Sequence, residues 1–285
     1  MLLFVMLGNL GPLPRHAVVP ALIATALMLA QCDRTGREPV KTQTVPAQPA
    51  SPSSAPVATI LGRADLLAAT VQAASAYAAG ERLEGADPLI GHRFAIRIPF
   101  GCSGPQPTSD NAPADGLARW SWGTGNRTIQ LTLTPADWTG SALVADVGKE
   151  AGQEAVEGFW VPRPWLTSSD CSSVEVDSLQ ATATSPQTVG LAAVFDADDS
   201  RIGRRDGRAY AFTVRPTGDA PLPAPVGGYR LVLEGRLASF ADGRAIRCRA
   251  GSPDQRPVCV AAIRLDRVAF TEADGSLLLS EWRAD

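Results

Sequence analysis

The chain has 285 residues, of which 45% are hydrophobic and 19% are charged, so it is a globular protein and not a disordered one over most of its length. Its 26 basic and 29 acidic residues give a formal net charge of −3. Because such a weak field cannot hold a polyanion, nucleic-acid binding is not expected.

The N-terminal segment predicts export. An apolar run from Ala17 to Ala30 follows Arg15 and His16. Its length is that of a signal-peptide core and is short for a membrane span, which needs about 20 apolar residues. Residues 1–31 are therefore predicted to be a signal peptide.

The residues Leu29-Ala30-Gln31-Cys32 at the end of this run resemble the lipobox of bacterial lipoprotein precursors. The resemblance covers the first 32 residues, with Gln31 standing where that family normally has Gly, Ala or Ser. It implies that Cys32 is lipidated and tethers the protein to a membrane, on the periplasmic side of the bacterial cell envelope. The alternative is an uncleaved anchor in which Cys32 is an incidental thiol.

A linker is predicted over residues 32–60. The stretch from Thr35 to Ala58 contains five prolines among Ser, Thr, Gln and Ala, with almost no large apolar side chain. Such a segment buries too little surface to offset the entropy of ordering it. It is typical of a disordered tether between a lipid anchor and a folded domain.

Four cysteines remain beyond Cys32. In an oxidising compartment an even number predicts disulfides. Cys248 and Cys259 lie on two strand-like runs joined by a short polar loop, so we expect them to pair, which leaves Cys102 for Cys171. No CxxC spacing indicates a redox role.

A helix is predicted from about Asp65 to Ala79, where apolar residues recur at helical spacing before Gly80. The period then changes to two, which predicts strands at 93–100 and 128–134. A turn-like segment at 123–126 predicts a β-hairpin between the runs 117–122 and 127–134.

Further strands are predicted in the second half of the chain. The runs 189–195 and 210–214 are interpreted as a pair across a charged loop, and a last set of strands covers 229–237, 244–249, 258–270 and 276–282. A second helix is predicted at 142–156. The fold class is therefore mainly β, with disulfide-bonded antiparallel sandwich or barrel-like modules and one N-terminal helix.

Two domain divisions are compatible with this pattern. The proline-rich segment 216–225 is either a long loop or a linker between domains. The first reading gives one continuous domain, 61–285. The second gives a β-rich domain with an N-terminal helix at 61–215 and a C-terminal β-hairpin module at 226–285. We favour the second, because each part then holds one complete cysteine pair.

Candidate ligand-binding residues lie in a tryptophan-rich stretch. Exposed aromatic rings beside arginines can form a stacking platform for sugars or other flat ligands, although small β-domains also use tryptophan to fill their cores. The candidate residues are Trp120, Trp122, Trp160, Arg163 and Trp165.

A second candidate is the charged loop 196–208. Its acidic run Asp196-Ala197-Asp198-Asp199 lacks the spacing of a calcium loop. The arginines that follow could equally hold a phosphate or a carboxylate. They are Arg201, Arg204, Arg205 and Arg208.

Catalytic motifs are scarce. No G-x-S-x-G elbow, P-loop or S-x-x-K motif occurs, and once His16 is removed His92 is the one imidazole, which excludes sites with two histidine ligands. No catalytic residue, metal or cofactor is predicted. The favoured interpretation is a non-enzymatic envelope lipoprotein that binds a glycan or an envelope protein or has a structural role. The alternative is an exported hydrolase that uses carboxylates on glycan or peptidoglycan.

Overall fold

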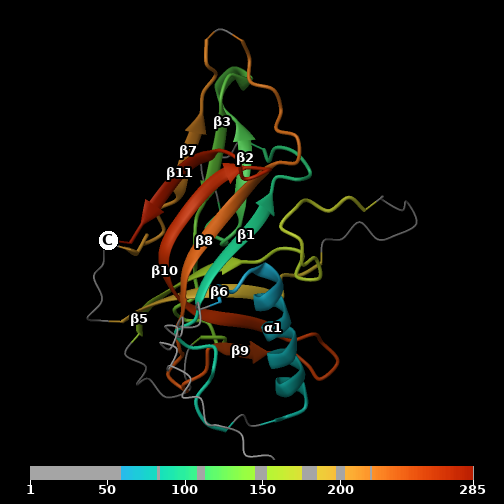
Figure 1. Cartoon of the computed structure of the whole chain (residues 1–285), viewed down its shortest axis with the longest axis vertical. Helices are drawn as coiled ribbons and strands as arrows, with labels where there is room; N and C mark the ends of the chain where they lie inside the picture. Colours follow the sequence, from blue (N-terminus) through green and yellow to red (C-terminus); the bar gives the residue numbers. More distant parts are fainter. Residues whose placement is uncertain are drawn as a thin grey trace, which may run out of the picture. The chain divides into compact units, whose positions relative to one another are not determined.

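The computed structural model describes residues 59–81, 84–107, 113–144, 153–174, 185–196, 203–218 and 220–284. The predicted signal peptide, Cys32 and the linker up to residue 58 lie outside these ranges. The elements, shown in Figure 1, are α1 (Arg63–Ala78), β1 (Arg93–Phe100), β2 (Ala118–Trp122), the 3-10 helix η1 (Thr124–Asn126), β3 (Ile129–Leu133), β4 (Ala136–Asp137), β5 (Gln153–Trp160), β6 (Val189–Asp196), β7 (Tyr210–Val214), β8 (Tyr229–Leu237), β9 (Ile246–Arg249), β10 (Val258–Glu272) and β11 (Leu278–Arg283).

The strands form two sheets. The larger has the order β1-β8-β10-β6-β5-β4, with β9 and β11 also paired to β10, and the smaller has the order β2-β3-β7. Every strand pair is antiparallel except β6 with β10. The predicted fold class is confirmed: the protein is mainly β, sandwich-like and disulfide-bonded.

Alternation along the strands explains the core. In β1 the side chains of Phe94, Ile96, Ile98 and Phe100 are all buried, as the period of two predicts. They join a core that also contains residues of α1, β2, β3, β7, β8 and β10. A second, smaller cluster contains Trp138, Val156, Ala192, Val260 and Phe240. Both clusters draw on β5, β6 and β10, because successive side chains of a strand point to opposite faces.

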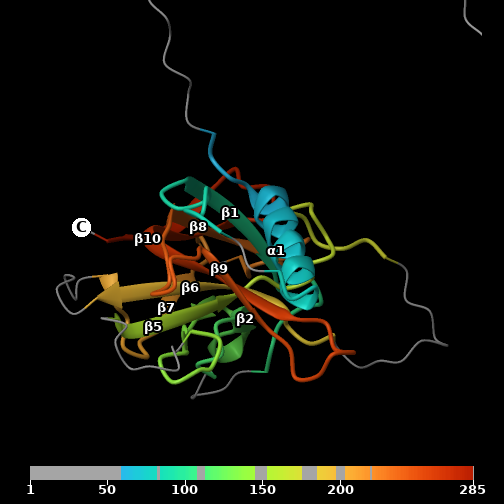
Figure 2. The ribbon, with the colours of Figure 1, turned by 90° about the horizontal axis from the view of Figure 1, so that it is seen from below.

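Several predicted elements are confirmed. The helix occupies Arg63–Ala78. The hairpin joins β2 to β3, with Ala118 opposite Leu133. The last set of strands is also present as β8 to β11. In Figure 2, α1 lies beside β1 and β9, which places the helix along one side of the larger sheet.

Two predictions are wrong. The strands β6 and β7 do not pair with each other, since β6 lies between β5 and β10 whereas β7 pairs with β3. Alternation identifies a strand but carries no information about its partner. The second helix, predicted at 142–156, is replaced at Gln153–Val156 by the start of β5, and residues 145–152 lie outside the described ranges.

Strands from both sides of the proline-rich segment share the larger sheet. Both β8 and β10 follow this segment in the chain, yet they lie between β1 and β6, which precede it. Within the part of the chain that the structure describes, no helix is long and apolar enough to cross a membrane.

Candidate functional site

The central strand β10 changes partners halfway along its length. On one side it pairs with β6 as far as Ile263, and with β11 from Arg267 onward. Between these points Arg264, Leu265 and Asp266 have no ladder partner on that side, although the Asp266 carbonyl accepts a hydrogen bond from the Ala284 amide at 3.1 Å. An opening in the sheet results.

A β-bulge lies at the same place on the other side of β10. The pairing with β8 runs from Leu265 opposite Gly235 directly to Arg267 opposite Glu234, so Asp266 is the extra residue. Gly235 permits this close approach, because a Cβ atom there would lie 2.0 Å from the Arg264 carbonyl oxygen. Bulges re-aim side chains and are frequent beside binding sites.

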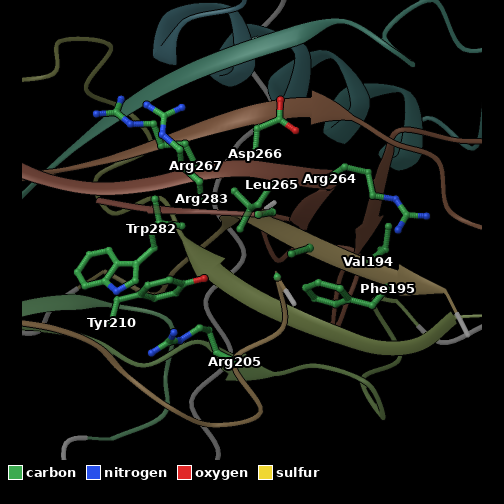
Figure 3. Close-up of a pocket in the computed structure, with 14 residues that line it drawn as sticks. Val194, Phe195, Arg205, Tyr210, Arg264, Leu265, Asp266, Arg267, Trp282 and Arg283 are labelled. Atoms are coloured by element: carbon green, nitrogen blue, oxygen red, sulfur yellow. The ribbon is translucent and has the colours of Figure 1, made fainter. Parts of the chain in front are cut away.

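A cavity of about 320 Å³ occupies the opening (Figure 3). This volume is at the lower end of the range for small-molecule pockets. Residues from five parts of the chain line it: β6, the 203–205 segment, β7, the middle of β10 and the end of β11. They include Phe195, Arg205, Tyr210, Arg264, Leu265, Asp266, Arg267, Trp282 and Arg283.

Aromatic rings form one wall of the cavity. The Tyr210 and Trp282 rings meet edge to face with centroids 5.2 Å apart, and Trp282 also contacts Phe270 at 5.5 Å. Figure 3 shows the Tyr210 hydroxyl pointing into the cavity, and no described residue hydrogen-bonds to it. Burial raises the pKa of Tyr210, with the charge of Glu157 adding to the effect. The hydroxyl therefore stays protonated and can donate a hydrogen bond.

Arg205 lies against this wall. Its guanidinium carbon is 4.6 Å from the centroid of the Tyr210 ring, a cation–π distance. Its Nε and Nη2 atoms donate to the carbonyls of Arg208 and Ala209 at 3.3 and 2.6 Å. Among the described residues no carboxylate pairs with this guanidinium, so its charge is available to an anion.

The arginines on β10 and β11 are engaged differently. Arg267 donates to Glu234 and Glu281 at 2.9 and 2.8 Å, and Arg283 also pairs with Glu281. In Figure 3 both guanidinium groups lie on the far side from the Tyr210 hydroxyl. These two charges are largely neutralised. Of Arg205, Arg267 and Arg283, therefore, Arg205 alone has no carboxylate partner among the described residues.

A buried carboxylate holds the segment that carries Arg205. Glu157, 7% exposed, accepts the amide hydrogens of Arg205 and Asp206 on Oε1 at 2.7 and 2.9 Å, whereas Oε2 has no hydrogen-bond partner among the described residues. Burial raises the pKa of Glu157 despite these hydrogen bonds. Asp206 has a positive φ of 51°, so Glu157 holds a turn in a conformation that favours glycine.

A second cavity, of about 350 Å³, is lined in part by Glu157. Asp137 is opposite Glu157 in the β4–β5 pair, and Asp206 and Arg204 also line this space. Hydrogen bonds from Thr139 lower the pKa of Asp137, so the two opposed carboxylates are shifted in opposite directions. No described tryptophan lines this cavity.

The predicted ligand residues are distributed over the molecule. Trp120 is 2% exposed and packs edge to face on Trp122 at 5.5 Å, in the main core. Trp160 packs on Trp138 at 4.7 Å, beside the second cluster. Trp165 is 59% exposed. The structure thus brings Trp120 and Trp122 together but does not gather the five residues, and ligand binding at them stays a prediction.

Arg163 has a local structural role. Its Nη2 atom donates to the Pro99 carbonyl at 2.7 Å and contacts Cys102 Sγ at 3.5 Å. Burial lowers its pKa. This arginine therefore links the segment after β5 to the end of β1.

Both predicted disulfides are confirmed. Cys248 and Cys259 are direct partners in the β9–β10 register, and their sulfurs are 2.04 Å apart. Cys102 and Cys171 are joined across 69 residues. Among the described residues, no group of three or more His, Cys, Asp or Glu side chains could hold a metal ion, and His92 is exposed.

Sequence reasoning missed most of the cavity. The sequence predicts Arg201, Arg204, Arg205 and Arg208 as possible anion ligands, of which Arg201 lies outside the described residues. Tyr210 and Trp282 belong to strands that the sequence predicts without a binding role, and Glu157 follows a segment that it predicts as a helix. No known family model, curated protein or solved structure matches the chain.

Proposed function

We propose that the protein is an exported, membrane-tethered lipoprotein of the bacterial cell envelope whose β-rich domain binds a small ligand without transforming it. The N-terminal resemblance supports the anchor at Cys32, and the two disulfides agree with an oxidising compartment. The single observation that carries the binding function is the cavity where β10 exchanges β6 for β11.

The wall of this cavity defines the class of ligand. The Tyr210 hydroxyl supplies a hydrogen-bond donor, Arg205 supplies a positive charge, and Phe195, Leu265 and Trp282 supply apolar surface. A guanidinium favours planar carboxylate or phosphate groups, and aromatic rings favour a flat apolar body. The ligand is therefore a small molecule with one anionic group on an apolar frame.

Isothermal titration calorimetry of phenyl phosphate and benzoate binding to the mature protein tests this proposal. Benzyl alcohol serves as the neutral analogue. We expect the anions to bind and Arg205→Ala to weaken them about tenfold, the cost of one charge-assisted hydrogen bond. Arg215→Ala removes an exposed arginine outside the cavity and is the matched control. Equal binding of the neutral analogue, or an unaffected Arg205→Ala variant, contradicts the proposal.

The anchor has its own test. A Cys32→Ala protein should lose incorporation of a fatty-acid probe and the processing to the mature form. Equal labelling of the two proteins would contradict the lipoprotein part of the proposal. Gln31, which stands where a lipobox has Gly, Ala or Ser, would then explain the lack of lipidation.

The second candidate, a carboxylate-dependent hydrolase, is favoured by one observation, the opposed pKa shifts of Asp137 and Glu157 beside the second cavity. Glu157, however, already uses Oε1 to hold the 205–206 amides. Release of reducing ends from peptidoglycan by the wild type, lost in Asp137→Asn, would favour the hydrolase over the binding protein.

A further inference from the structure

The disulfide between Cys102 and Cys171 is the more accessible of the two. Both of its cysteines are half-buried, whereas Cys248 and Cys259 of the second disulfide are 9% and 1% exposed. Cys102 lies in the turn that follows β1, and Cys171 lies in the irregular segment 161–174, between exposed residues. A thiol from another molecule can therefore reach the first disulfide far more readily than the second.

A guanidinium contacts one of the two sulfurs. Arg163 Nη2 lies 3.5 Å from Cys102 Sγ, and the same atom donates to the Pro99 carbonyl at 2.7 Å. The Nε atom of Arg163 is buried and has no hydrogen-bond partner among the described residues. Because the guanidinium is one planar fork of donors, this orphaned donor is available to a negative charge that forms on Cys102 Sγ.

The other sulfur has the opposite surroundings. The Gly227 carbonyl oxygen lies 3.0 Å from Cys171 Sγ. The neighbouring Asp170 carboxylate is paired with Arg230, whose charge it neutralises. A partial negative charge thus faces Cys171, and a positive charge faces Cys102. Since a nearby cation stabilises a thiolate, Cys102 is the better leaving group of the two.

We propose that the Cys102–Cys171 bond is a thiol–disulfide exchange site that accepts two electrons from a dithiol. A thiolate of the substrate attacks Cys171 Sγ and bonds to it, the Cys102–Cys171 bond breaks, and its electron pair stays on Cys102 as a thiolate beside Arg163. The second substrate thiolate then attacks the substrate sulfur of this mixed disulfide, and Cys171 leaves. The dithiol becomes a disulfide, and its two electrons and two protons reduce the cysteine pair to two thiols. This activity does not depend on the cavity beside β10.

The wild-type protein tests which sulfur is attacked. The mature, oxidised protein is treated with reduced glutathione, which has one thiol and therefore stops at the mixed disulfide. Early samples are quenched in acid, and their cysteines are mapped. We expect glutathione on Cys171 and a free thiol at Cys102. Glutathione mainly on Cys102, or equally on both cysteines, overturns the proposal.

The rate of reduction by dithiothreitol tests the role of Arg163. Arg163→Met should slow the opening of the Cys102–Cys171 bond severalfold, because the leaving thiolate loses its cation. Arg163→Lys keeps a positive charge and should restore part of the rate. Arg215→Met removes an exposed arginine after β7, and this matched control should react as the wild type does.

The direction of the change separates this role from a merely structural one. Loss of the hydrogen bond to the Pro99 carbonyl alone would loosen the disulfide and speed its reduction. An Arg163→Met rate equal to or above that of the wild type therefore overturns the proposal. Reduction of Cys248–Cys259 in the wild type as fast as that of Cys102–Cys171 overturns it too. The glutathione experiment needs no variant, so it decides the site of attack even where Arg163→Met does not fold.

Discussion

Glu157 and Arg205 are joined through the backbone and not through their charges. Oε1 of Glu157 accepts the Arg205 amide hydrogen at 2.7 Å, while the Arg205 guanidinium lies 4.6 Å from the Tyr210 ring centroid at the cavity. A buried acid thus positions the arginine and leaves its side chain to the cavity. The geometry of the aromatic wall depends on the state of that acid.

The first prediction concerns the pH dependence of stability. Burial raises the pKa of Glu157, so the folded protein holds this proton more tightly than the unfolded chain does. The wild type should therefore lose stability, relative to Glu157→Gln, as the pH rises from the ordinary glutamate pKa through the raised value. The limiting slope for one proton is about 1.4 kcal/mol per pH unit.

Urea unfolding of both proteins across the acidic to neutral range measures this difference. The Glu157→Gln curve should lie progressively above the wild-type curve as the pH increases. A constant offset between the two would show that Glu157 titrates normally. Glu281→Gln changes an exposed glutamate whose pKa is lowered and should shift the difference in the opposite sense.

The second prediction concerns Arg63, which is 3% exposed and bonds to three carbonyls. Burial, with a smaller effect of Arg163, lowers its pKa to about 10. Arg63→Met keeps the apolar stem but leaves these carbonyls without their donor. The free energy of unfolding should fall by about 2–4 kcal/mol. Arg215→Met changes an exposed arginine and is the control. Denaturant unfolding in which Arg63→Met and Arg215→Met change the free energy of unfolding equally would contradict the anchoring role of Arg63.

The sequence predicted most of the strands because half-buried strands leave a period of two, as in Phe94, Ile96, Ile98 and Phe100. It also predicted the Cys248–Cys259 bond, because both cysteines are local. It placed β6 and β7 together wrongly, since the partner of a strand depends on contacts distant in sequence. The sequence predicts a helix at the start of β5, because Ala and Val residues there fit both periods.

The cavity was less visible than the fold. Arg205 stood out as part of an arginine-rich loop, but Tyr210 and Trp282 are 72 residues apart and meet only because β10 exchanges one neighbour for another. Of the tryptophans between 120 and 165, Trp120 and Trp122 pack in one buried cluster and Trp138 and Trp160 in the other, whereas Trp165 is exposed. Packing, which a single sequence does not display, decides which aromatic residues face a ligand.

The third prediction compares the two disulfides. In the loop-entropy account, the bond that closes 69 residues stabilises by about 4 kcal/mol and the one that closes 11 residues by about 3 kcal/mol. Cys102→Ala with Cys171→Ala should therefore lower the free energy of unfolding more than Cys248→Ala with Cys259→Ala. Guanidinium unfolding of the two double variants tests the order. The reverse order would indicate that packing of the buried Cys259, and not loop closure, dominates.

The last prediction separates the hydroxyl of Tyr210 from its ring. Tyr210→Phe keeps the surface on which Arg205 lies but removes the donor that points into the cavity. Since no described residue bonds to this hydroxyl, the variant should fold as stably as the wild type. Its affinity for phenyl phosphate should fall about fivefold, the value of one hydrogen bond of about 1 kcal/mol.

Tyr229→Phe is the control for this substitution, because Tyr229 is also buried, with its pKa raised to about 12, but does not line the cavity. Calorimetric titrations of the two variants should differ only in affinity for the probe. Burial raises the pKa of Tyr210 above the usual tyrosine value of about 10, so its hydroxyl stays protonated through neutral and mildly alkaline pH. The affinity of the wild type for phenyl phosphate should therefore stay level over this range. Equal affinities of Tyr210→Phe and Tyr229→Phe would mean that the anion does not reach the Tyr210 hydroxyl, and the binding site would have to be sought outside the opening beside β10.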